Sequence, residues 1–288
     1  MKKFFVDNNF NGKKLNIFLF YKLPTLSSNL FYKTLRKKDI RVNGKRVSEN
    51  VTIFENDEID VYIADDFLSP NLKIVYEDDN ILIIDKPINI EVTGKDSLTT
   101  FVHTQYLNAT FMPMPCHRLD RNTSGLIVYA KNDQALHVLL NKFKNHEIEK
   151  HYLAMVYGLP KIKSKRCEAY LFKDSKKSLV YISDIPKKGY SKIITSYKVL
   201  KENVGNNTAI LDVEIETGKT HQIRAHLAHL GFPIIGDGKY GINEVNKRFG
   251  KKYQMLYSYK IKFNFKTDSN VLEYLTNKDF SIDILSKL

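Results

Sequence analysis

Tryptophan is absent from this chain of 288 residues, and cysteine is scarce, with Cys116 and Cys167 as its two thiols. They lie far apart and form no Cys-x-x-Cys pair, which argues against a zinc ribbon and against a disulfide framework. Long apolar runs are missing too. No stretch approaches the ~20 apolar residues that a membrane span needs, and Asp7 ends the short apolar start before a signal-peptide core could form. We therefore expect a soluble, cytoplasmic protein with no membrane partner.

Acidic residues are in deficit. The chain has 45 Lys and Arg residues against 32 Asp and Glu residues, which gives a net charge of +13 and a pI near 9.4. A lysine-rich composition bias accounts for part of this excess, and the remainder indicates a polyanionic partner, with nucleic acid as the first candidate. The hydrophobic fraction of 43% suffices for one large domain and one small one.

Residues 13–63 have the pattern of a small α/β unit. Two stretches with helical apolar spacing precede a hairpin signal at Asn43-Gly44. This order resembles an S4-like RNA-binding domain, to which we assign residues 1–64, followed by a polar linker over 65–73. The S4-like resemblance implies that basic residues of this unit contact RNA phosphates, whereas a solvated helix face is the alternative. The expected RNA contacts are Arg36, Lys37, Lys38, Arg41, Lys45 and Arg46.

The remainder, 74–288, has a mixed pattern. Irregular spacing and hairpin-like pairs favour a mixed α/β (α+β) fold, with a largely antiparallel central sheet and flanking helices, over a repeating βαβ array. The segment 160–208 is basic, turn-rich and poor in periodicity, and the sequence does not indicate its role. One amphipathic helix fits 133–145, and strand-like runs recur at 73–76, 81–85, 126–130, 151–157, 209–216 and 256–265.

The segment 116–125 has the charge pattern of an anionic catalytic site. It places Asp120 between Arg118 and Arg121 and then bends through a polar, glycine-ended turn into an apolar run. Nearby cations favour the charged form of a carboxylate, so Asp120 could act as a nucleophile rather than as an acid. The alternative is a surface turn with solvated side chains.

The sequence His-Arg-Leu-Asp-Arg-Asn-Thr-Ser-Gly at 117–125 resembles the active-site motif of the RluA/RluC/RluD-type family of RNA pseudouridine synthases. Three further segments are similar to that family in the same order: the hairpin at 75–87, the tyrosine-bearing strand at 150–158 and the basic motif at 217–227. The resemblance implies a catalytic domain over 74–288 that isomerises uridine in RNA to pseudouridine.

That reaction cleaves the N-glycosidic bond, rotates the base and re-attaches it through carbon 5, so no metal, redox group or other cofactor is expected. By the resemblance, Asp120 is the catalytic carboxylate, which attacks either the ribose or the base. Tyr152 would stack on the uracil and relay a proton, although a packed core tyrosine is the alternative. Lys219 would pair with Asp120 and hold it ionised.

The resemblance also implies RNA contacts around this site. Arg118 would enter the space that a flipped uridine vacates, or else contact a phosphate. Arg224, on a helix expected to begin near His221, contacts RNA or has a structural role. A zinc site of His221, His226 and His229 is disfavoured, because no Cys or acidic ligand lies near them in the sequence. The expected RNA contacts here are His117, Arg118, Arg121 and Arg224.

RNA is thus the expected partner. Because of the S4-like domain, large-subunit ribosomal RNA is favoured over transfer RNA. Nothing in the sequence requires an obligate protein partner, so we expect a monomer. Two other functions stay open: an RNA-binding ribosome-assembly factor with little catalysis and, ranked last, a glycoside hydrolase, which would need two opposed carboxylates.

Overall fold

Two separate sheets organise the chain in a computed structural model that describes residues 1–23, 26, 28–63, 72–107 and 109–285. The chain divides into an N-terminal unit, Met1–Leu72 with Thr93–Met112, and a sheet unit, Lys73–Val92 with Pro113–Leu288. This division differs from the predicted domains, because the segment 93–112 was expected in the catalytic domain. Residues 65–71 of the predicted linker lie outside the described residues.

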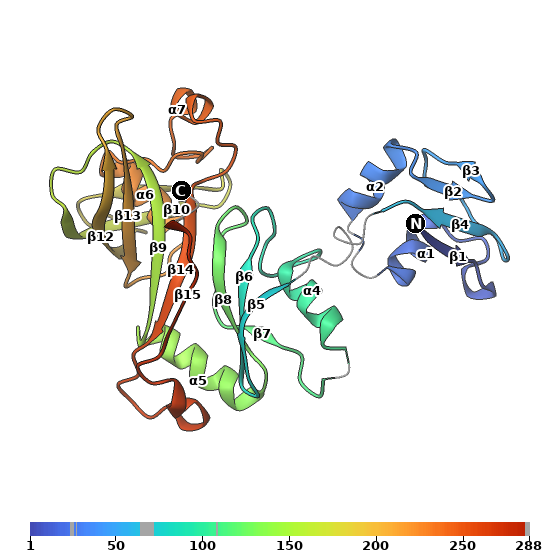
Figure 1. Cartoon of the computed structure of the whole chain (residues 1–288), viewed down its shortest axis with the longest axis horizontal. Coiled ribbons are helices and arrows are strands. Elements are labelled where there is room, and N and C mark those ends of the chain that lie inside the picture. The colour runs from blue at the N-terminus through green and yellow to red at the C-terminus, as the bar shows by residue number, and fades with distance from the viewer. Residues whose placement is uncertain (24–25, 27, 64–71, 108, 286–288) are drawn as a thin grey trace. The chain divides into compact units, whose positions relative to one another are not determined.

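The N-terminal unit has a four-stranded antiparallel sheet with the order β1-β4-β2-β3 (Figure 1). Phe18 and Phe31, one from each of its first two helices, are fully buried in one core with Ile59. The predicted hairpin is confirmed: Asn43 and Gly44 have φ angles of 49° and 76°, as its two-residue turn requires. The elements are β1 (Lys2–Phe5), η1 (Asn8–Phe10), α1 (Leu15–Lys22), α2 (Ser28–Arg36), β2 (Ile40–Val42), β3 (Lys45–Arg46), β4 (Glu58–Val61) and α4 (Leu98–Gln105).

The sheet unit is built on an eleven-stranded sheet with the main order β11-β10-β12-β13-β9-β14-β8-β6-β5. Neighbouring strands pair antiparallel except β8 and β14, which are parallel. The expected fold, mixed α/β with a largely antiparallel central sheet, is confirmed. The strands are β5 (Lys73–Glu77), β6 (Ile81–Lys86), β7 (Met114–Pro115), β8 (Ser124–Ala130), β9 (Ile148–Tyr157), β10 (Ser164–Asp174), β11 (Leu179–Ser183), β12 (Ser191–Asn203), β13 (Thr208–Ile215), β14 (Leu256–Phe263) and β15 (Asp279–Ser281).

Short helices flank this sheet. The helix predicted over 133–145 is confirmed as α5, which Asn132 caps by accepting a hydrogen bond from the Ala135 N–H. The helix expected near His221 is confirmed as α6, which packs against β11 and β12. No helix in the described part of the chain is long and apolar enough to cross a membrane. The helices are α5 (Asp133–Lys144), α6 (Gln222–His229), α7 (Asn243–Arg248) and η2 (Asn270–Leu275).

Candidate active site

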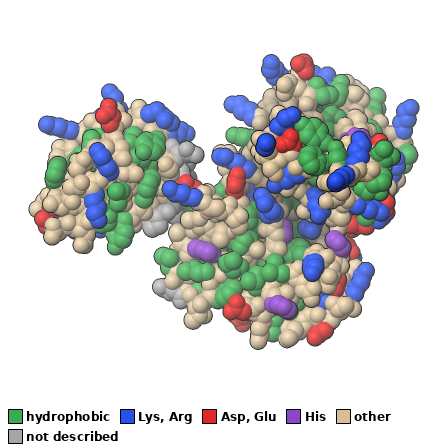
Figure 2. Space-filling view, turned by 180° about the vertical axis from the view of Figure 1, so that it is seen from behind, with side chains coloured by type: hydrophobic (Ala, Val, Ile, Leu, Met, Phe, Trp, Pro, Cys, Tyr) green, Lys and Arg blue, Asp and Glu red, His purple; other side chains and the backbone are tan. Residues whose placement is uncertain are grey.

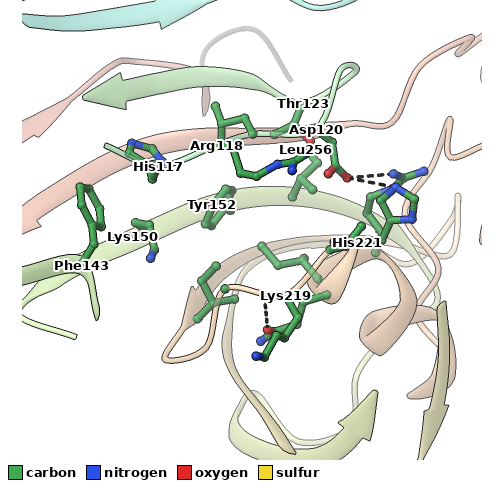
Figure 3. A pocket seen from close by; sticks show the side chains of 17 residues that line it. His117, Arg118, Asp120, Thr123, Phe143, Lys150, Tyr152, Lys219, His221 and Leu256 are labelled. Atoms are coloured by element: carbon green, nitrogen blue, oxygen red, sulfur yellow. Dashed lines mark hydrogen bonds and ion pairs between the residues drawn. The ribbon is translucent and has the colours of Figure 1, made fainter. Parts of the chain in front are cut away.

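One cavity of about 250 Å³ in the sheet unit gathers most of the predicted site residues (Figure 3). Its walls come from the loop before β8, from β9, from the loop after β13 and from α6. Asp120 is the one carboxylate among the described residues that line it, whereas four lining side chains are cationic. The predicted site residues in its lining are His117, Arg118, Asp120, Tyr152, Lys219 and Arg224.

Buried contacts hold the loop that carries Asp120. The Thr123 N–H donates to the Asp120 carbonyl at 3.0 Å and closes a turn, while Gln254 Nε2 donates to Thr123 Oγ1 at 2.6 Å. Lys86 is fully buried, and its ammonium donates to three backbone carbonyls, one of them that of Arg121. Burial lowers the pKa of Lys86 to about 8. Backbone turns and buried donors therefore set the position of Asp120.

Gly125, the second residue of β8, allows β8 to lie against β14 just beyond this loop. Its φ is 111°, and a Cβ added there would overlap the backbone carbonyl of Ser258 in β14. We expect Gly125→Ala to separate these strands, to destabilise the protein by at least about 2 kcal/mol and to reduce activity. Urea denaturation checks this. Gly94→Ala is the matched control, since Gly94 has a similar φ of 119° with open space around it; equal effects of the two changes would contradict the overlap argument.

Arg224 of α6 joins Asp120 to a second carboxylate. Its Nη1 donates to Asp120 Oδ2 at 2.9 Å, and its Nε and Nη2 donate to the two oxygens of Asp237 at 2.7 and 3.0 Å. The Asp237 side chain is fully buried, that of Arg224 is 8% exposed and that of Asp120 is 23% exposed. Burial opposes the charge of Arg224, but the two carboxylates raise its pKa overall. A fixed, permanent cation therefore lies against the exposed carboxylate.

The partner of Asp120 is not the predicted one. Among the described residues, its ion pairs within 4 Å are with Arg224 and with His221, whose Nε2 lies 3.9 Å from Oδ2. Lys219 lines the cavity without pairing with Asp120, so the predicted Lys219–Asp120 pair is wrong. Arg224, which we expected to contact RNA or to have a structural role, bridges two carboxylates, and RNA contact by it stays a prediction.

The arginines beside Asp120 in the sequence do not pair with it either, within the described residues. Arg118 is exposed and lines the cavity. Arg121 is exposed outside the cavity lining, and its Nε donates to Asn89 Oδ1 at 3.2 Å. The turn directs these two side chains away from Asp120, so its charge partner is Arg224 and not an arginine adjacent to it in the sequence. RNA contact by either arginine stays a prediction.

His221 is a site residue whose role the sequence did not indicate. It has a left-handed backbone (φ 53°) directly before α6. The Tyr240 hydroxyl accepts the Val180 N–H at 2.9 Å and can therefore donate its own hydrogen to His221 Nδ1, also 2.9 Å away. With that donation the imidazole hydrogen lies on Nε2, the nitrogen that is 3.9 Å from Asp120 Oδ2. Burial lowers the pKa of His221, which favours this neutral form.

The sequence analysis did not identify Asp237 and Tyr240 as site residues. They lie in the segment Gly-Asp-Gly-Lys-Tyr-Gly at 236–241, a glycine-rich turn in which the Asp237 carboxylate accepts the backbone N–H groups of Lys239 and Tyr240. The glycine-rich composition of this segment predicts a turn. It does not predict that the turn binds the guanidinium of Arg224.

Tyr152 lies on β9 beside Asp120. Its strand neighbours are Val213 in β13 and Ser258 in β14, and β14 has a bulge between Ser258 and Lys260. The side chain is 5% exposed and lines the cavity. Burial, and then the negative charge of Asp120, raise the pKa of Tyr152. At neutral pH the phenol is therefore protonated, and it can donate a hydrogen bond into the cavity.

His117, a predicted RNA contact, lines the cavity and bonds to the backbone of β8. Its Nε2 accepts the Val128 N–H at 3.1 Å. Burial and the positive charge of Lys150 lower the pKa of His117 to about 3. The neutral imidazole is thus fixed against the backbone of β8, and RNA contact by His117 stays a prediction.

The histidines of the disfavoured zinc site point to separate partners. His221 bonds Tyr240, His226 Nδ1 lies 3.0 Å from Thr195 Oγ1, and His229 Nε2 lies 2.9 Å from Asp184 Oδ1. In the part of the chain that the structure describes, no three His, Cys, Asp or Glu side chains are placed to hold a metal ion.

The predicted RNA contacts of the N-terminal unit lie at the end of α2 and on the β2–β3 hairpin. Arg41 is half-buried, with its guanidinium 5.1 Å from the centroid of the Tyr62 ring. On the face of this unit seen in Figure 2, blue Lys and Arg side chains are more frequent than red acidic ones. RNA contact by this cluster stays a prediction. Its exposed members are Arg36, Lys37, Lys38, Lys45 and Arg46.

Comparison with known proteins identifies the family. The sequence model of the family described as RNA pseudouridylate synthase matches residues 80–229. An "Uncharacterized RNA pseudouridine synthase" of Mycoplasma capricolum subsp. capricolum is 33% identical over 301 aligned residues, which cover 96% of each chain. A "Ribosomal large subunit pseudouridine synthase C" of Rickettsia bellii is 34% identical and covers 80% of this chain and 83% of its own. This chain therefore belongs to the RNA pseudouridylate synthase family.

Solved structures agree on the fold. The structure of "Human RNA Pseudouridylate Synthase Domain Containing 4" superposes with a TM-score of 0.59 at 20% identity, covering 73% of this chain and 88% of its own.

The predicted family and reaction class are confirmed by the family match and the sequence relatives: the protein is an RNA pseudouridine synthase, an isomerase of the intramolecular transferase type.

Proposed function

We propose that Asp120 is the catalytic carboxylate of this RNA pseudouridine synthase. The observation that carries the proposal is its place as the single acidic group in the described lining of a cation-rich cavity. Arg224 holds Oδ2, and no hydrogen bond to Oδ1 is formed by any residue that the structure describes. One carboxylate oxygen is therefore fixed while the other is available for attack on the ribose or on the base.

The other lining groups suit the remaining steps. The protonated Tyr152 phenol can donate to the uracil, and its ring offers a surface on which the base can stack. Detachment of the uracil from the ribose leaves negative charge on the base. Lys219, which lines the cavity without an ion pair among the described residues, supplies a cation that would stabilise that charge.

Large-subunit ribosomal RNA is the proposed substrate. Several relatives are named "Ribosomal large subunit pseudouridine synthase C", among them one of Rickettsia bellii and one of Vibrio parahaemolyticus that is 28% identical and covers 93% of this chain. The net charge of +13 suits a structured RNA. The exposed basic cluster of the S4-like N-terminal unit would add contacts to the phosphate backbone beyond the modified uridine.

Pseudouridine mapping tests the substrate. Total RNA is compared between cells with the gene, cells without it, and deleted cells complemented by wild type or Asp120→Asn. We expect one or a few discrete sites in large-subunit ribosomal RNA to be lost on deletion and restored by wild type alone. Sites found in transfer RNA would refute the proposed substrate, and sites restored by Asp120→Asn would refute the role of Asp120. Equal rescue of a growth defect by both proteins would favour a role in ribosome assembly.

A further inference from the structure

Lys150 is a cation in the cavity with no anion beside it. It lies two residues before Tyr152 on β9 and lines the same cavity. Among the described residues its ammonium makes no hydrogen bond or ion pair, and it lies over the Phe143 ring, whose centroid is 5.2 Å from Nζ. Burial lowers the pKa of Lys150 to about 8. The charged form of this side chain is therefore poorly stabilised in the free protein.

Two buried lysines of the sheet unit, Lys86 and Lys142, have the acceptors that Lys150 lacks within the described part of the chain. The Lys86 ammonium donates to three carbonyl oxygens, and that of Lys142 donates to Glu147 and to two oxygens of Thr267. Removing a cation from water costs free energy that a contact with an aromatic ring regains only in part. An anionic ligand would supply the missing acceptors at Lys150.

The position of Lys150 fits one particular anion. Figure 3 shows Lys150 and Phe143 toward one end of the cavity, Asp120 and His221 toward the other, and Tyr152 between them. Alternate residues of a strand share a face and lie roughly 6.5 Å apart. This spacing is comparable with the separation between the base-bearing ribose carbon of a nucleotide and its phosphate. A uridine bound against Asp120 and Tyr152 would therefore bring a backbone phosphate to Lys150.

We propose that Lys150 binds an RNA backbone phosphate adjacent to the uridine in the cavity, an inference that rests on the proposed catalytic role of this cavity. The ammonium donates to the phosphate oxygens, and Phe143 holds the side chain against one wall. Because the phosphate carries no base identity, this contact positions the nucleotide and does not select its sequence. The alternative is a purely structural role, in which contact with Phe143 is the whole function of the side chain.

The test removes the proposed contact once by changing the RNA phosphate and once by changing Lys150. Synthetic RNA containing the uridine found by mapping is prepared with a neutral methylphosphonate in place of its 5′ or its 3′ phosphate. Binding is measured for proteins with Lys150 and with Lys150→Met, all carrying Asp120→Asn to prevent turnover. We expect Lys150→Met to weaken binding roughly 10- to 100-fold, one methylphosphonate to weaken binding of the Lys150 protein similarly, and the combination to cause no further loss. The slope of log affinity against log salt should fall in magnitude by about 0.7 to 0.9.

Three controls make the result specific. Lys150→Arg, which keeps the charge, should restore most of the affinity, and Lys161→Met, at an exposed position outside the cavity lining, should have no effect. Thermal unfolding of Lys150→Met should occur at the same or a higher temperature, because a partly buried cation with no anionic partner among the described residues is removed. Unchanged affinity or additive losses would overturn the proposal, as would a loss of stability alone. Turnover by Asp120→Asn would instead refute the catalytic role, and it would leave the binding comparison readable.

Discussion

Asp120→Asn will abolish pseudouridine formation, with a fall in turnover of more than about 10³-fold, the scale seen when a group that attacks the substrate is removed. Asparagine has nearly the same shape and can still accept the Arg224 hydrogen bond through its amide oxygen, but it lacks the nucleophilic charge. Arg224 keeps both bonds to Asp237, so the fold should persist. Chromatographic quantification of pseudouridine in digested RNA measures the loss.

Asp184→Asn is the matched control for this substitution. The Asp184 side chain is 78% exposed, pairs with His229 and lies outside the cavity lining. It should retain wild-type turnover. RNA affinity of Asp120→Asn should equal or exceed that of wild type, because one negative charge leaves a cavity that receives a polyanion. Weak RNA binding together with low turnover would show that Asp120 acts in folding or binding rather than in the chemistry.

Local sequence located the loop around Asp120 but not its charge partner. The motif, its polar turn and the apolar strand after it are contiguous within residues 117–130, and the structure forms that turn and strand. The pairing with Arg224 spans 104 residues and depends on how α6 packs against β11 and β12. Lys219 and Arg224 are both cations of the basic motif at 217–227. Only tertiary structure shows which of them pairs with Asp120. The second carboxylate, Asp237, is only 13 residues from Arg224, but its turn composition indicates a loop and not an ion pair.

Strands β10 and β12, within 160–208, lack a clear alternation in the sequence. Along β10 the buried residues are Cys167, Ala169 and Leu171, and the other face carries the aromatic Tyr170 and Phe172 as well as charged residues. Two small side chains give a faint period-two signal, although alternation is the pattern of a strand with one buried face. In β12 a bulge between Val199 and Lys201 shifts the register to β13. Such a shift interrupts the alternation that a sequence pattern would reveal.

Arg224→Met should cause the largest loss of stability among the single changes at this site. It leaves the Asp237 carboxylate fully buried with two backbone N–H donors and no cation. Removing one partner of a buried ion pair typically costs about 3–5 kcal/mol. Urea denaturation at pH 7.5 measures this. Arg224→Lys should recover only part of the stability, because one ammonium cannot reproduce the guanidinium's planar, two-pronged contact.

The pH dependence of Arg224→Met separates a missing charge partner from a packing defect. In wild type, burial alone would raise the pKa of Asp237, but Arg224 lowers it overall. Its ionised pair therefore stabilises the fold above the unfolded pKa of about 3.9, and this contribution is lost as pH falls through the folded pKa. Without Arg224, burial dominates and the folded pKa rises. In Arg224→Met, the contribution of Asp237 to the stability of the fold is then fully present below its unfolded pKa. That contribution is lost as the pH rises through its folded pKa.

Relative to wild type, Arg224→Met should thus lose less stability at pH 5 than at pH 7.5. The double variant Arg224→Met/Asp237→Asn, which has no buried charge here, should regain most of the stability and lose this pH dependence. Its turnover should stay low, because Asp120 still lacks the cation that holds Oδ2. A deficit in Arg224→Met that is independent of pH and unrelieved by Asp237→Asn would mean that the guanidinium acts by filling space, and the charge bridge between the two carboxylates would then not be what orders the site.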